Sequence, residues 1–147
     1  MDAAGNPADT KKQFYALGFA IYGLSEYARA TGDERALREA IGLFRAIEEH
    51  SYDAVNNGYE EAAARDWSPI DDVRLSDKDA NEKKTMNTHL HILEAYTNLL
   101  RIWPDEGLRR QTRNLLEIFL SRIVQPQNGH LGLFFDDRWQ LKSAGCF

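Results

Sequence analysis

The sequence predicts an all-α protein: a repeat array or toroid of αα-hairpins, with a long ordered loop and a short β-hairpin. Two observations predict this class. Four segments carry apolar residues at steps of three and four, which is the spacing of a helix with one buried face. These segments follow one another in pairs joined by short turns, so each pair forms an antiparallel hairpin. Two such hairpins in succession are typical of helical arrays and toroids.

The composition is that of a globular protein. The chain has 147 residues, of which 43% are hydrophobic and 28% charged, enough for one domain with its own core. We therefore expect a single domain over residues 1–147. A net charge of −5 and the lack of basic runs longer than a pair argue against a nucleic-acid partner. No segment approaches the ~20 apolar residues of a membrane span, so no membrane partner is expected.

The two ends of the chain suggest a piece of a larger domain. A turn-like segment leads directly into an apolar helix at the start, and the sequence stops just after a strand-like segment. Residues 1–12 hold no apolar signal core, so a reducing, cytoplasmic setting is expected. Cys146 is the single cysteine, and it can supply neither an internal disulfide nor a metal cluster.

The first helix is expected over about residues 9–31, with Asp9 or Thr10 as its N-cap and Gly32 as its C-terminal stop. Its apolar residues are dense enough to cover most of the helix circumference. A helix that is apolar nearly all round is expected to be buried nearly all round.

An aromatic row runs along this first helix. Tyr15, Phe19 and Tyr22 follow one another at steps of four and three, so their rings lie on one face. Core packing explains any one of these rings taken alone. The functional alternative is a platform on which the flat apolar face of a sugar can stack.

The second helix is expected over residues 34–50 and completes the first hairpin. Its inner face carries Ala36, Ala40, Leu43, Phe44 and Ile47. His50 ends the helix, where an imidazole suits the negative end of the helix dipole, so it is interpreted as a cap.

Residues 51–83 form a long loop. The tyrosines and the tryptophan within it indicate order, since disordered segments are poor in aromatic residues. Asp77 and Asp79 have the alternating spacing of a calcium loop, but the glycine and the terminal glutamate of an EF-hand are absent. No metal site is therefore expected.

The second hairpin consists of helices over about residues 81–103 and 105–124, with Pro104 between them. A turn follows at residues 126–129, and residues 131–141 read as two short strands around a pair of aspartates. His130 is interpreted as a turn residue.

Asn87 and His91 are the candidate site residues of the third helix. They lie four positions apart, so an amide and an imidazole share one helical face and can converge on one ligand. His89 points elsewhere. The other face carries the apolar stripe Met86, Leu90, Leu93 and Tyr96 or Thr97, which is expected to pack on the core. The structural alternative is that Asn87 and His91 only cap or satisfy buried backbone groups.

Three stretches carry a family resemblance. Residues 11–33, residues 76–99 with the run MNTHLHILEAYT, and the Gly-Tyr-Glu of residues 58–60 resemble the N-acylglucosamine 2-epimerase superfamily, in particular its cellobiose 2-epimerase branch. The resemblance extends over residues 2–143. It implies part of an (α/α)6 barrel, and the chain resembles only the middle portion of these enzymes.

The resemblance also implies an activity and a site. These enzymes interconvert reducing-end glucose and mannose by removing and returning the C2 proton, without a cofactor. His91 matches their active-site histidine that contacts the sugar oxygens and is the catalytic candidate, and Asn87 matches the asparagine one turn before it. Tyr15 and Phe19 match a Tyr-x-x-x-Phe helix that lines the cavity, although Leu17 stands where a glutamine is frequent.

The departures from the family predict an incomplete site. The two histidines that resemble the acid/base pair of the family would follow the end of this sequence, and an arginine of the site would precede Met1. The isolated chain is therefore expected to be inactive. Two alternatives stay open: a noncatalytic carbohydrate-binding remnant, and a helical-repeat interaction module. The preferred sugar and the oligomeric state are also left open.

Overall fold

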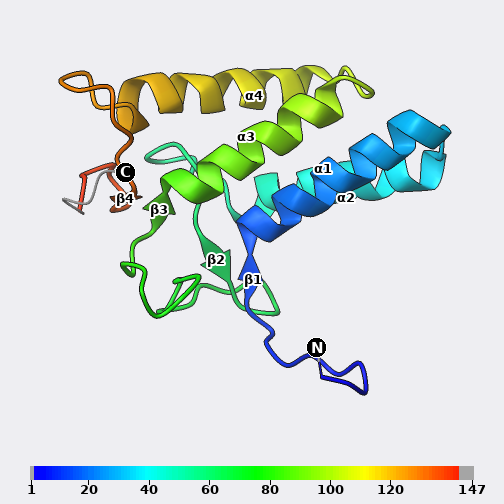
Figure 1. The fold of residues 1–147 in the computed structure, drawn as a ribbon, viewed down its shortest axis with the longest axis horizontal. Helices are drawn as coiled ribbons and strands as arrows, with labels where there is room; N and C mark the ends of the chain where they lie inside the picture. Colours follow the sequence, from blue (N-terminus) through cyan, green and yellow to red (C-terminus); the bar gives the residue numbers. More distant parts are fainter. Residues whose placement is uncertain (1, 143–147) are drawn as a thin grey trace.

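The computed structural model describes residues 2–142 and contains both expected helical hairpins. In Figure 1, α3 crosses the molecule between α1 and α4, and the long loop lies beside the starts of α1 and α3. No helix within these residues is both long enough and apolar enough to cross a bilayer. The helices are α1 Phe14–Thr31, α2 Glu34–His50, α3 Met86–Leu100 and α4 Glu106–Ile118, and a π-helix, η1 Phe119–Ile123, continues α4.

Helix α1 begins at Phe14, so the expected start near residue 9 is wrong. The preceding residues form strand β1, Lys12–Gln13, which pairs antiparallel with β2, Ala62–Ala63. Pairing with the distant loop holds the backbone extended and delays the helix. The expected end is confirmed, because Gly32 adopts φ +74° and donates its backbone N–H to Ala28 O at 2.8 Å.

Helix α3 also begins later than expected, at Met86. Strand β3, Lys84–Thr85, precedes it and pairs antiparallel with β4, Phe134–Phe135. Thr85 then caps the helix, its hydroxyl accepting the Thr88 N–H at 3.1 Å. The helix start is thus fixed by a strand that comes from the end of the described chain.

The starts of α2 and α4 agree with their sequence signals. Asp33 accepts the N–H groups of Arg35 and Ala36, and Asp105 accepts that of Leu108 at 3.0 Å. These caps involve residues only two or three positions away, so local sequence is enough to place them.

The expected β-hairpin is present in short form. The chain reverses at Asp136, whose N–H donates to Gln140 O at 3.1 Å, and a single bridge joins Phe135 to Leu141. Strand β4 nevertheless makes its longer pairing with β3. The segment therefore anchors the start of α3 as well as closing on itself.

Helix α1 is not buried nearly all round, contrary to expectation. One face, formed by Phe14, Gly18, Ile21, Ser25 and Ala28, packs against α2 and α3. The rings of Phe19 and Tyr22 remain 51% and 47% exposed. Residues 2–142 contain no further helix that covers this side of α1.

The buried face of α3 agrees with the expected stripe only in part, since Tyr96 is fully buried and Leu93 packs on the core while staying half-buried. Met86, Leu90 and Leu93 are only half-buried. The fully enclosed side chains are Thr88, His89, Ile92, Ala95, Tyr96 and Leu99. Because α3 lies between α1, α4 and the loop, contacts on several sides decide which face is covered.

A buried polar cluster links the loop to three helices. Glu48 of α2 accepts hydrogen bonds at 2.7 Å from the hydroxyls of Tyr59 and Tyr96. Its second carboxylate oxygen accepts from Gln111 Nε2 of α4 at 2.5 Å. This cluster supports the prediction, made from the aromatic residues of the loop, that the loop is ordered.

Helices α1 and α3 approach closely at Gly18, where a Cβ atom would lie 3.0 Å from the backbone oxygen of His91. We expect Gly18→Val to lower the free energy of unfolding by about 1–3 kcal/mol, because a larger side chain forces the two helices apart. Urea denaturation of the purified chain measures this change.

Gly23 on the same helix supplies the matched control, since a Cβ atom there would meet nothing within 4 Å. Gly23→Ala is expected to raise the unfolding free energy by up to about 1 kcal/mol through helix propensity. A Gly18→Val protein as stable as the wild type would contradict the close approach of α1 and α3.

Candidate functional site

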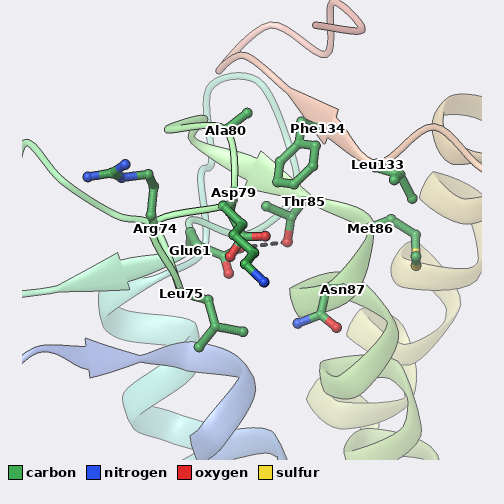
Figure 2. A pocket seen from close by; sticks show the side chains of 11 residues that line it. Glu61, Arg74, Leu75, Asp79, Ala80, Thr85, Met86, Asn87, Leu133 and Phe134 are labelled. Atoms are coloured by element: carbon green, nitrogen blue, oxygen red, sulfur yellow. Dashed lines mark hydrogen bonds between the residues drawn. The ribbon is translucent and has the colours of Figure 1, made fainter. Parts of the chain in front are cut away.

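A pocket of about 460 Å³ opens where the long loop meets β3, β4 and the first turn of α3. Both polar and apolar side chains line it (Figure 2), with Leu75 from the long loop and Asn87 from α3. Its polar lining residues include Glu61, Arg74, Asp79 and Asn87, and its apolar ones include Leu75 and Phe134. The pocket therefore combines hydrogen-bonding groups with apolar surface, as small-molecule sites do.

Asn87 is the second residue of α3 and lines this pocket. The Thr85 cap fixes the first turn of the helix and thereby the position from which the amide extends. Among residues 2–142, no hydrogen bond engages the Asn87 side chain, which leaves both its oxygen and its nitrogen available to a ligand. The expectation that this amide serves only to cap the backbone finds no support in its bonding.

Glu61 is a pocket residue that the sequence reasoning missed. Its side chain is 4% exposed, and its Oε2 accepts a hydrogen bond from the Thr85 hydroxyl at 2.6 Å. Burial raises the pKa of this carboxyl above its usual value. Glu61 belongs to no helix or strand, so no periodic pattern marks it; the Gly-Tyr-Glu segment beside it was the only available signal.

His91 lies one turn beyond Asn87, against the aromatic row of α1. Its ring centroid is 4.4 Å from that of Phe19 and 6.1 Å from that of Tyr15. Its Nδ1 lies 2.8 Å from the Glu94 carboxylate, which favours the tautomer with the proton on Nδ1 and the lone pair on Nε2. The structure thus brings together His91, Tyr15 and Phe19.

The pocket walls include Asn87 but not His91, Tyr15 or Phe19. A second, more open hollow between α1 and α3 is lined by Phe19 and Glu94, two of the residues that contact His91. His91 thus lies on α3 between the two hollows. That Asn87 and His91 act on one ligand stays a prediction.

The other histidines have different surroundings. His89 is fully buried; its Nδ1 lies 2.7 Å from Thr85 O, and its Nε2 accepts the Tyr59 N–H at 2.9 Å. His50, at the last turn of α2, stacks on Trp67 with 4.2 Å between ring centroids. His130 is exposed and comes directly after the predicted turn rather than within it. His91 is therefore the histidine beside the site.

Within residues 2–142, no cluster of three or more His, Cys, Asp or Glu side chains could hold a metal ion. Asp79 accepts hydrogen bonds from the N–H and the hydroxyl of Ser76, at 2.9 and 2.8 Å, and so orders the loop itself. Cys146 lies outside the described residues.

Comparison with known proteins gives concordant results. The family model of N-acylglucosamine 2-epimerase (GlcNAc 2-epimerase) matches residues 1–146. A cellobiose 2-epimerase of Bacteroides fragilis is 61% identical over 94% of this chain and 35% of its own length. One of Ruminococcus albus is 40% identical over 96% of this chain and 36% of its own length.

Solved structures agree with these matches. The cellobiose 2-epimerase of Bacillus thermoamylovorans superimposes with a TM-score of 0.88 at 39% identity, covering 94% of this chain and 36% of that protein. A D-mannose isomerase, with a TM-score of 0.72 at 16% identity, shares the fold. The chain spans about 35% of the length of the curated relatives it matches. Its two hairpins have the fold of part of an (α/α)6 barrel, which confirms the expected fold class.

Proposed function

Because the chain belongs to the N-acylglucosamine 2-epimerase family, we propose that it forms the sugar-binding wall of a carbohydrate 2-epimerase. The proposed reaction interconverts the reducing-end glucose and mannose of cellobiose-type disaccharides, as the names of its relatives suggest. The observation that carries the proposal is the Asn87 amide, which no side chain or backbone group of residues 2–142 engages, in a pocket beside His91.

The chemistry needs groups of this kind. Removing the C2 proton of an open-chain sugar places negative charge on the aldehyde oxygen, and a hydrogen-bond donor aimed at that oxygen stabilises it. The Asn87 amide can donate such a bond. His91, with Nδ1 held by Glu94, presents Nε2 as an acceptor for a proton or a sugar hydroxyl.

The aromatic row supports sugar binding. Phe19 keeps half of its surface exposed beside His91, and Tyr15 meets Phe19 edge-on with 6.0 Å between ring centroids. An exposed ring of this kind can pack against the C–H face of a pyranose. We propose Tyr15 and Phe19 as substrate-binding residues on this ground.

We further propose that residues 1–147 are one part of a barrel whose other segments complete the reaction. Inversion at C2 requires a proton to leave one face of the carbon and another to arrive at the opposite face, so two proton carriers are needed. His91 is the one histidine beside the site, whereas His50, His89 and His130 lie elsewhere. The isolated chain is therefore proposed to bind sugar without turning it over.

A cellobiose titration followed by NMR tests the proposal. We expect Asn87→Ala to weaken cellobiose binding by roughly 2- to 10-fold, the effect of one lost hydrogen bond. Gln127→Ala, which removes an amide from the exposed turn at residues 126–129, is the matched control and should bind like the wild type.

Turnover is examined by incubating the chain with cellobiose in heavy water and measuring deuterium at C2. We expect binding without deuterium incorporation; incorporation that His91→Ala abolishes would show that this chain alone carries out proton exchange. If the wild-type chain binds no cellobiose, the proposal is wrong. The exposed rings of Phe19 and Tyr22 would then favour the interaction module.

A further inference from the structure

Glu61 places a carboxyl group in the pocket with one oxygen occupied and one in contact with solvent. Oε2 accepts the hydroxyl hydrogen of Thr85. Among residues 2–142 no other hydrogen bond to the carboxylate meets normal geometry, although the buried Thr88 hydroxyl lies close enough to lower the pKa of the carboxyl. Glu61 lines the pocket, and Oε1 keeps contact with solvent there.

Both the backbone N–H and the backbone C=O of Glu61 form hydrogen bonds. Its N–H donates to Lys83 O at 3.2 Å, and its C=O accepts the Phe14 N–H at 3.1 Å. These bonds join it to the segment before α3 and to the first residue of α1. With the Thr85 bond added, the carboxyl is fixed before any ligand arrives, and a fixed acceptor loses little entropy on binding.

The charge of Glu61 has no cationic partner, since no lysine, arginine or histidine of residues 2–142 forms an ion pair with it. A buried carboxylate of this kind is costly. A glutamine could accept the Thr85 hydrogen bond without that cost. Structural support alone thus gives no reason for a carboxyl at this position.

The surroundings of Oε1 indicate what it binds. Asn87 lies on an adjoining wall of the same pocket, so an acceptor and an amide converge on one space (Figure 2). Neighbouring hydroxyls of a sugar donate and accept in the same arrangement, and carboxylates accept hydrogen bonds from hydroxyls strongly. Apolar Leu75 and Phe134 complete the walls.

We propose that Glu61 is a further ligand-binding residue of this pocket, with Oε1 accepting a hydrogen bond from a hydroxyl of the sugar that Asn87 also binds. This inference rests on the proposed function and adds a residue to its binding site. It also predicts that binding changes the titration of Glu61, because a hydrogen bond donated to the charged form lowers the pKa of a carboxyl.

The test compares cellobiose affinity for the wild-type chain, Glu61→Gln and Glu60→Gln. Glu61→Gln is expected to bind about 10- to 100-fold more weakly, because a hydrogen bond to a charged acceptor is lost. Glu60→Gln removes the neighbouring carboxyl, which does not line the pocket, and should leave the affinity unchanged. Thermal unfolding verifies that each variant is folded.

A second readout separates ligand contact from structural support. The pKa of Glu61, measured by carbon NMR of its carboxyl, is expected to fall when cellobiose saturates the protein. Unchanged affinity in Glu61→Gln together with an unchanged Glu61 pKa would overturn the inference, while a weakened Asn87→Ala would leave the proposed function standing. A wild-type chain that binds no cellobiose would overturn both.

Discussion

Lys84→Ala is expected to lower the free energy of unfolding by about 3–5 kcal/mol, the cost of removing one partner from a buried ion pair. The Lys84 side chain is 0% exposed, and its Nζ lies 2.7 Å from the Asp53 carboxylate. The same ammonium donates to Asp137 O at 2.6 Å and lies 5.4 Å from the centre of the Trp139 ring. The variant would leave the half-buried Asp53 carboxylate without its cation and the Asp137 carbonyl without its donor.

The effect is large because Lys84 joins three distant parts of the chain: the loop, β3 and the turn after β4. Urea denaturation measures it, with Lys83→Ala as the matched control at the adjacent, half-buried lysine. We expect the control to change stability by no more than about 0.5 kcal/mol. A loss below about 1 kcal/mol in Lys84→Ala would show that the pair does not stabilise the fold.

The same ion pair gives stability a dependence on acid pH. Burial by itself would raise the pKa of Asp53, but hydrogen bonds from Lys84 and Asn56 outweigh it and lower the pKa to about 2. Since this folded-state pKa is below the ordinary value of 3.8, the contribution is complete above pH 3.8 and is lost as the pH falls toward 2.

The second large effect is expected between pH 6.5 and pH 4, from His89. Burial lowers the pKa of His89 from 6.5 to about 4, so the folded protein holds this ring neutral. Its hydrogen bond with Tyr59 also requires the neutral ring, because Nε2 must accept the Tyr59 N–H, while Nδ1 donates to Thr85 O. Above pH 6.5 the contribution of His89 to the free energy of unfolding is constant. As the pH falls from 6.5 to 4, the imidazole takes up a proton in the unfolded chain but not in the folded protein, so the folded protein loses stability.

Measuring the free energy of unfolding at a series of pH values between 6.5 and 4 checks the effect of His89. The loss assigned to His89 is about 3 kcal/mol, the free-energy equivalent of a pKa change from 6.5 to about 4. Comparing the wild type with His89→Gln cancels the other titrating groups. His130→Gln, at an exposed position outside the helices and strands, is the control. If His89→Gln keeps the full pH dependence of the wild type, the buried neutral ring is not its source.

The predicted fold was accurate where signals were local. Gly32 ends α1 through a bond to a residue four positions away and was identified from sequence, and the starts of α2 and α4, capped by Asp33 and Asp105, were placed to within one residue. The starts of α1 and α3 were placed too early, since strands β1 and β3 pair with segments about 50 residues away. Such pairing leaves no mark in the sequence around the helix start.

In the candidate site, too, local features could be predicted from the sequence and contacts between distant segments could not. The spacing of Asn87 and His91 on one helix could be read directly, and the family resemblance identified Tyr15 and Phe19 on another. That His91 packs on Phe19, and that Asn87 opens into a pocket shared with Glu61, depends on how the loop and α1 meet α3.

By itself, the sequence determined the two helical hairpins, the Gly32 helix stop and the family, because these depend on periodicity and on side chains close together along the chain. Only the tertiary structure decided which histidine is buried, which carboxyl lines the pocket and which face of α1 stays exposed. Burial is set by the surfaces that distant segments bring together. The environment of His89 or Glu61 therefore arises only when the loop closes over the starts of both helices.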